Sequence, residues 1–70
     1  MGRKDEAILC YYQTIKINPN FCHAYINKGN VLKDLGRFEE AIVCYDQAIR
    51  IDSNIASAHF NKGNILKAMH

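Results

Sequence analysis

The chain has 70 residues, of which 49% are hydrophobic, and a formal net charge of +2. A compact globule of this length buries only about 60% of its unfolded surface, so we expect one small folding unit. The charge is too weak and too dispersed to favour nucleic acid, and no apolar run approaches the roughly 20 residues needed to span a membrane.

Two helices are predicted in the first half of the chain. In residues 5–17, apolar side chains recur at helical spacing and acids occupy the first turn, where the helix dipole favours them. Pro19 ends this helix, because proline has no amide to donate and disfavours a helical residue before it. A second helix follows over residues 22–35, and Gly36 closes it. Gly29 costs that helix about 1 kcal/mol against alanine, which predicts close packing there.

The second half of the chain repeats these features. Residues 38–51 have the pattern of the first helix, and residues 55–69 have the pattern of the second. Laying the sequence on itself with an offset of 34 aligns 36 residue pairs, of which 18 are identical. Chance would give about two or three, so the chain contains an internal repeat. No strand pattern competes, and the fold class expected is all-α, with antiparallel helical hairpins.

The three cysteines are expected to be free thiols. Their number is odd, and Cys10 and Cys44 occupy the same repeat position, so neighbouring units would hold them too far apart to bond. Free thiols are typical of a reducing compartment, which predicts a cytoplasmic protein.

The repeat resembles the tetratricopeptide repeat, a helical hairpin of 34 residues. The positions of the central unit that match its signature, or hold a related apolar or aromatic residue, are Tyr25, Gly29, Leu32, Ala41, Tyr45 and Ala48. Lys28 and Ser53 depart from the signature, but a lysine can lay its stem along apolar surface and keep its ammonium in water. His59 stands at a place for a large aromatic residue, so we expect it to be packed.

The resemblance implies a right-handed α-solenoid in which residues 1–70 form one fragment. Residues 5–17 would be the second helix of one repeat, 22–54 a full repeat, and 55–70 the first helix of the next. Each end helix then lacks its hairpin partner, which leaves apolar surface in water. The residues expected on these two end faces are Ala7, Tyr11 and Thr14 on the first helix and Gly63, Leu66 and Met69 on the last.

Two interpretations of the end faces are compatible with each other. The last helix of one molecule would pair with the first helix of another, in a head-to-tail self-association that closes or stays open according to the rotation. Alternatively, the chain is an excerpt from a longer array whose neighbouring repeats cover both ends.

The resemblance also implies a concave groove, and with it a protein or peptide partner. The residues expected to line the groove are His23, Ile26, Asn27, Asn30 and Lys33 on the second helix and Phe60, Asn61, Asn64 and Lys67 on the fourth. Side-chain amides suit the N–H and C=O groups of an extended peptide, and a row of them resembles the asparagine ladder found in other members of the family. The lysines would favour acidic segments. The alternative is that these polar side chains form an ordinary solvated surface.

Catalysis, metals and cofactors find no support in the sequence. Cys22 and His23 are neighbours along a helix and therefore diverge, and the paired short spacings of a zinc site are lacking. The carboxylate clamp of other family members needs cations at places where this chain has residues such as Ile26 and Phe60. We therefore expect a binding module that is not an enzyme and needs no cofactor.

Overall fold

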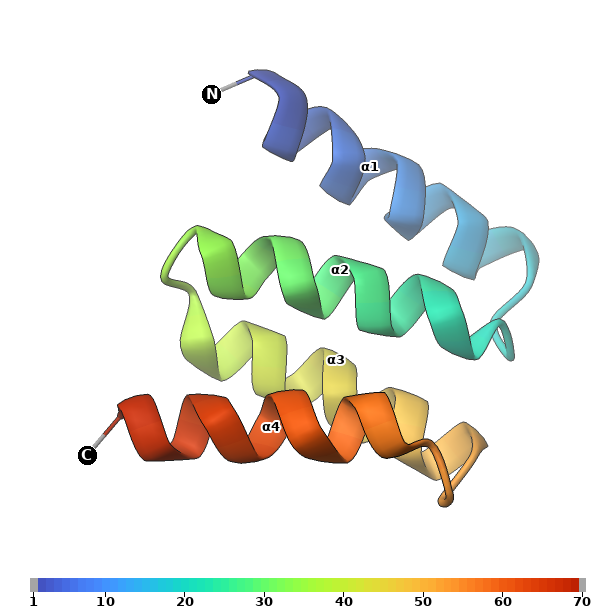
Figure 1. Cartoon of the computed structure of the whole chain (residues 1–70). Helices are drawn as coiled ribbons and strands as arrows, with labels where there is room; N and C mark the ends of the chain where they lie inside the picture. The colour runs from blue at the N-terminus through green and yellow to red at the C-terminus, as the bar shows by residue number, and fades with distance from the viewer. Residues whose placement is uncertain (1, 70) are drawn as a thin grey trace.

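The computed structural model of the chain describes residues 2–69, which form four α-helices (Figure 1). The helices are α1 (Gly2–Ile17), α2 (Cys22–Asp34), α3 (Phe38–Ile51) and α4 (Ala56–Ala68). No strand occurs among these residues, which confirms the all-α prediction. The predicted bounds of α3 are those observed. The other helices differ from prediction by one to three residues at their ends, where hydrogen bonding is weakest.

Consecutive helices run in roughly opposite directions, and the four helices do not form a closed bundle, because within residues 2–69 α1 does not pack on α3 or α4 (Figure 1). Each helix packs on the next, and α2 also packs on α4 (Figure 1). The extents of 33 × 30 × 14 Å describe a flat slab. Such an arrangement, in which contacts join neighbouring units only, is typical of a solenoid.

The α2–α3 turn is fixed by Gly36, as the sequence predicts. Its φ of +78° lies in the left-handed region that glycine adopts without strain. The amides of Gly36 and Arg37 donate to the carbonyls of Lys33 and Leu32, both at 2.9 Å, and so satisfy the last turn of α2.

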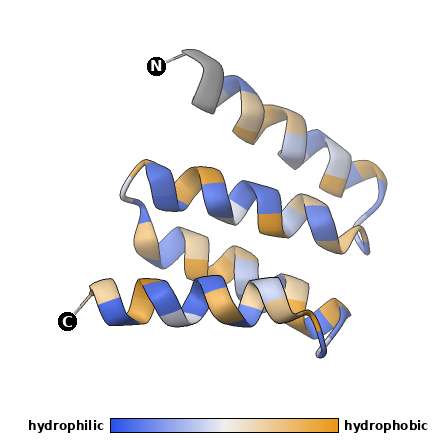
Figure 2. Ribbon diagram, in the orientation of Figure 1, coloured by the Kyte–Doolittle hydropathy of each residue, from blue (hydrophilic) through white to orange (hydrophobic). Residues whose placement is uncertain are grey.

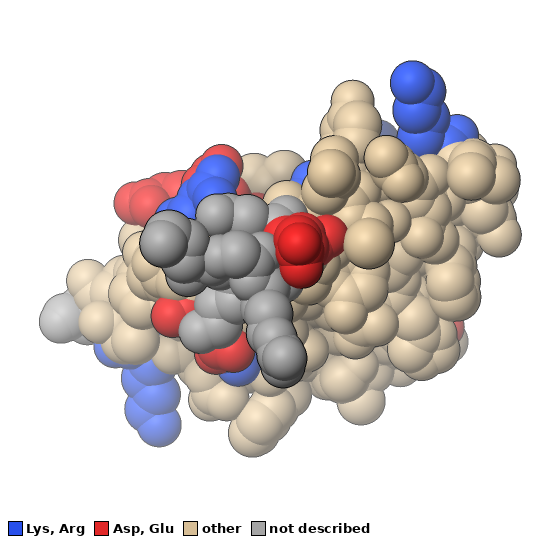
Figure 3. Space-filling view, turned by 90° about the horizontal axis from the view of Figure 1, so that it is seen from above, with Lys and Arg blue, Asp and Glu red and all other residues tan. Residues whose placement is uncertain are grey.

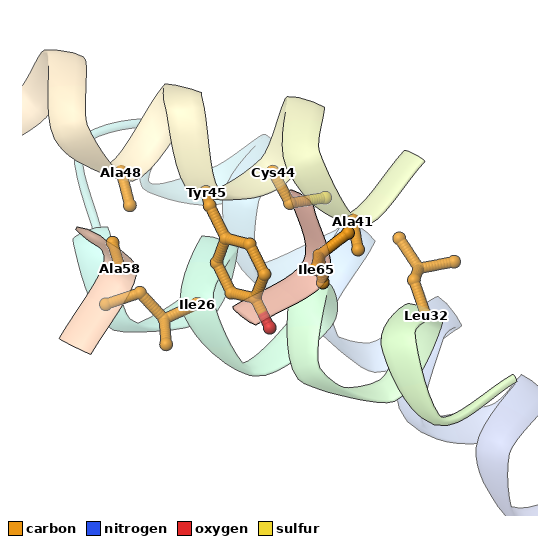
Figure 4. Close-up of a cluster of buried hydrophobic side chains, with 8 residues drawn as sticks. All are labelled: Ile26, Leu32, Ala41, Cys44, Tyr45, Ala48, Ala58 and Ile65. Atoms are coloured by element: carbon orange, nitrogen blue, oxygen red, sulfur yellow. The ribbon is translucent and has the colours of Figure 1, made fainter. Parts of the chain in front are cut away.

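The core lies where α3 packs between α2 and α4, and hydrophobic bands alternate with hydrophilic ones along the helices (Figure 2). Its buried members are Ile26, Leu32, Ala41, Cys44, Tyr45, Ala48, Ala58 and Ile65 (Figure 4). Three of these are alanines, whose small side chains allow the helix backbones to approach closely. Tyr45 is the largest, and its ring reaches from α3 into the space beside α2 and α4.

Two glycines at the same repeat position have different surroundings. A Cβ added to Gly29 would lie 2.7 Å from Cε1 of Tyr45, closer than packed carbon atoms come, so only glycine admits the ring. A Cβ added to Gly63 would meet no atom of the described residues within 4 Å. The close packing expected of this position is therefore confirmed at Gly29, whereas the corresponding surface of α4 is open.

This difference predicts opposite effects of the same substitution. Gly29→Ala should lower the free energy of unfolding by about 1 kcal/mol, because displacing the Tyr45 ring costs more than the gain in helix propensity. Gly63→Ala should raise it by about 0.5–1 kcal/mol, because alanine stabilises an open helical position. Urea unfolding of dilute protein, followed by circular dichroism, measures both. Shifts of the same sign in the two variants would contradict this account of Gly29.

Candidate functional site

The candidate site is an amide pair on the adjacent helices α2 and α4, formed by Asn30 and Asn61. Oδ1 of Asn30 accepts a hydrogen bond of 3.2 Å from Nδ2 of Asn61 and one of 2.5 Å from the hydroxyl of Tyr45. The hydroxyl is at the outer end of the core tyrosine (Figure 4). The core therefore holds the orientation of the Asn30 amide.

These bonds determine what the amide pair can offer to a ligand. Because Oδ1 of Asn30 accepts both bonds, its Nδ2 group is left to donate outward. Asn61 uses its Nδ2 group toward Asn30, so its Oδ1 is left to accept. One donor and one acceptor side by side match the C=O and N–H groups of an extended backbone.

Burial changes the protonation chemistry of Tyr45. Desolvation is the main cause that raises the pKa of its hydroxyl to about 12, and the negative charge of Asp34 adds to the effect. The hydroxyl therefore keeps its proton, and its role as donor to Asn30, well above neutral pH.

The other predicted groove residues differ in exposure. His23, Asn27, Asn64 and Lys67 are exposed, and Lys33 is half-buried. The His23 ring lies beside that of Phe21, with 6.3 Å between ring centroids. The structure thus brings Asn30 and Asn61 into direct contact and leaves the remaining polar side chains around them.

The prediction that Ile26 lines the groove is wrong. Its side chain is only 5% exposed, because α4 packs over this part of α2 and places Ala58 in the same core cluster. Phe60 holds the same repeat position on α4 and is 69% exposed. The repeat position of Ile26 and Phe60 is therefore buried where the corresponding helix of the next repeat packs on it, and is exposed where no such helix is described.

The end faces also differ in part from expectation. Gly63, Leu66 and Met69 are exposed, as predicted. Ala7, Tyr11 and Thr14 are half-buried rather than bare, because α2 packs against α1. The more exposed apolar side chains of α1 are Leu9, Tyr12 and Ile17.

The environments of His59 and of two lysines were not foreseen from the sequence. His59 is exposed rather than packed, and its Nε2 lies 3.0 Å from the carbonyl of Ser53. Lys28 and Lys62, at the same repeat position, reach back to the preceding helix. Their Nζ atoms lie 5.6 Å from the centre of the Tyr12 ring and 2.7 Å from Oδ1 of Asp46, respectively.

A separate cleft of about 300 Å³ lies between α1, α2 and α3. Its lining residues are Ile8, Lys28, Leu32, Arg37, Glu40, Val43 and Cys44. Arg37 and Glu40 form an ion pair beside it. No sequence signal marks this cleft, because its size depends on the angle between helices rather than on any one residue.

Other kinds of site lack a counterpart among residues 2–69. No group of three histidine, cysteine or acidic side chains there could hold a metal ion. None of the four helices is long and apolar enough to cross a membrane. On the face seen from the α1 side, basic side chains are scattered among acidic and uncharged ones rather than gathered in one patch (Figure 3).

Comparison with known protein families gives two matches. A family model described as TPR repeat matches residues 29–69, and a model described as tetratricopeptide repeat matches residues 10–43. No curated protein matches the chain at a significant level. The two family matches together span residues 10–69, which include the second part of α1, all of α2, α3 and α4, and the Asn30–Asn61 pair.

The raised pKa of Tyr45 predicts a loss of stability at alkaline pH. An unfolded tyrosine releases its proton near pH 10, whereas the folded Tyr45 keeps it until about pH 12, so the folded state loses stability between these values. Urea unfolding of the parent and of Tyr45→Phe across this range isolates the effect. The stability difference between them should shrink as pH rises, and parallel curves would exclude Tyr45 as the cause.

Proposed function

Because the chain belongs to the tetratricopeptide repeat family, we propose that it binds an extended segment of another protein across α2 and α4. Repeats of this family generally mediate protein–protein interaction, and they are typically not catalytic. In our proposed division of the chain, residues 22–54 are a full repeat between two single helices. The free cysteines fit a reducing, cytoplasmic setting.

The observation that carries this proposal is the fixed polarity of the Asn30–Asn61 pair. A solvated asparagine turns freely and must lose that freedom when it binds a ligand. Asn30 is already held by the Tyr45 hydroxyl and by Asn61, so part of this entropy is lost before a ligand arrives. The pair then offers its donor and acceptor to a peptide backbone without reading peptide side chains.

The residues around the pair extend the same chemistry. Asn27 and Asn64 are exposed on either side of it and supply further amides. Lys33 and Lys67 place positive charge on the same two helices, which favours an acidic segment mainly through its rate of association. Phe60 offers exposed apolar surface nearby on α4.

Association through the end faces is a second candidate function. The observation that favours it is the open surface at Gly63, where the same repeat position in α2 accepts the ring of Tyr45. This function would use α1 and the exposed side of α4, and it does not require a ligand on the amide pair.

The amide pair predicts the effect of removing side-chain amides. Asn27→Ala combined with Asn61→Ala should weaken binding of a short acidic peptide by about 2- to 10-fold for each amide that contacts it. A peptide of glutamate, valine and glycine, blocked at both ends, is a suitable probe, with calorimetry as the measurement. Helicity should not change, because both side chains lie outside the core.

The matched control is Asn20→Ala with Asn54→Ala. These two asparagines also share a repeat position, but they lie in the loops before α2 and α4. The control should bind the acidic peptide as the parent does, and a peptide with lysine in place of glutamate should bind more weakly to all three proteins. Equal affinity of the parent and the Asn27, Asn61 variant would refute the amide-pair proposal.

A further inference from the structure

We propose that the exposed side of α4 binds α1 of a second copy of this chain, with Tyr11 of the second copy seated on Gly63. The proposal rests on the second candidate function and names its partner and register. The chain itself contains the model for the contact. By the offset of 34, α4 corresponds to α2 and α1 corresponds to α3, and α2 and α3 are packed together.

Comparing the residues buried between α2 and α3 with their counterparts on α4 and α1 shows which side chains a second copy would cover. Leu32 is 3% exposed in the α2–α3 contact, whereas Leu66, its counterpart on α4, is 45% exposed. Tyr45 is fully buried, whereas its counterpart Tyr11 is only half-buried. The exposed surface of α4 and the partly covered surface of α1 are therefore the two halves of a contact that the chain makes once internally.

One predicted end-face residue does not belong to this contact. Met69 is 44% exposed, but its counterpart Leu35 remains 37% exposed although α3 follows it. Covering α4 by analogy with α2 would therefore change the exposure of Met69 little. Gly63 and Leu66 define the contact on α4, and Phe60 would be covered by α2 of the second copy, as Ile26 is covered by α4.

The polar groups of the contact are also complementary. In the chain, Oδ1 of Asn30 accepts from Tyr45 and from Asn61. The corresponding acceptor at the open side is Asn64, and the corresponding donors are Tyr11 and Asn27 of the second copy. The contact would thus complete a second amide pair beside the first and lengthen the proposed peptide-binding face.

The charges at the contact agree with the same register. The pKa of Glu40 is lowered mainly by its hydrogen bond with Arg37 and further by the charge of Lys28 across the α2–α3 contact. The counterparts of Glu40 and Lys28 are Glu6 and Lys62, which are of opposite charge.

The geometry of such a contact is head-to-tail. Different surfaces meet, so one copy keeps a free α1 and the other a free α4, and further copies can add at both ends.

Sedimentation velocity over about a hundredfold range of protein concentration tests the proposal, because association follows mass action. The mean mass of the parent should rise from 8.0 kDa as concentration increases. Gly63→Ala should weaken association at least about tenfold, because its methyl group occupies the place of the Tyr11 ring. Ser57→Ala, an exposed change on the same helix, should associate as the parent does.

Mixing two variants tests the direction of the contact. Gly63→Ala keeps the α1 surface, and Tyr11→Ala keeps the α4 surface, so each should be monomeric alone while their mixture forms a dimer of about 16 kDa, twice the mass of one copy. Glu6→Lys replaces Tyr11→Ala if circular dichroism shows that the latter is unfolded. Growth beyond the dimer or no dimer in the mixture would overturn the proposal, as would a monomeric parent.

Failure of this proposal is distinguishable from failure of the peptide-binding proposal. Gly63→Ala leaves Asn30, Asn61 and Tyr45 in place, so this variant should still bind the acidic peptide as a monomer. Peptide binding without self-association overturns the contact alone, and self-association without peptide binding overturns the amide-pair proposal alone.

Discussion

The approach of the Tyr45 ring to the backbone of Gly29 sets the distance between α2 and α3, and other features of the fold follow from that distance. A side chain at Gly29 would push the ring outward. The ring fills the space beside small residues such as Ala41, and its far end carries a hydroxyl out to Asn30. One residue therefore joins the packing of the core to the hydrogen bonding of the surface. A substitution that moved the ring would change both.

Because each helix packs only on helices of its own or the adjoining repeat, stability and exposure depend on position along the stack. The same repeat position can therefore differ in exposure between the two halves of the chain. Ile26 is covered and Phe60 is not, although both begin the same stretch of helix. Lys28 contacts the ring of Tyr12, and Lys62, at the same repeat position, contacts the carboxylate of Asp46. The partner residue differs, but in both repeats the lysine extends to the preceding helix.

The helices and turns could be predicted because their causes are local. Pro19 and Gly36 act through their own backbones, and the pattern of each helix occurs twice in the chain. The candidate site was predicted less well, because its features depend on contacts between repeats. The burial of Ile26 requires α4, and the direction of the Asn30 amide requires the Tyr45 hydroxyl. The cleft beside Ile8 depends on the angle between helices, which no residue pattern specifies.

The cysteines of α1 and α3 differ in exposure, so their rates of reaction with a thiol reagent differ as well. Cys44 is buried, and burial raises the pKa of its thiol, whereas Cys10, at the same repeat position, is exposed. Cys22 is half-buried and donates from its sulfur to the carbonyl of Ala48 at 3.3 Å. A maleimide dye should therefore attach first to Cys10 and reach Cys44 only when α3 separates from its neighbours. The labelling rate of Cys10 thus reports local opening of α1, and the labelling rate of Cys44 reports separation of α3 from its neighbours.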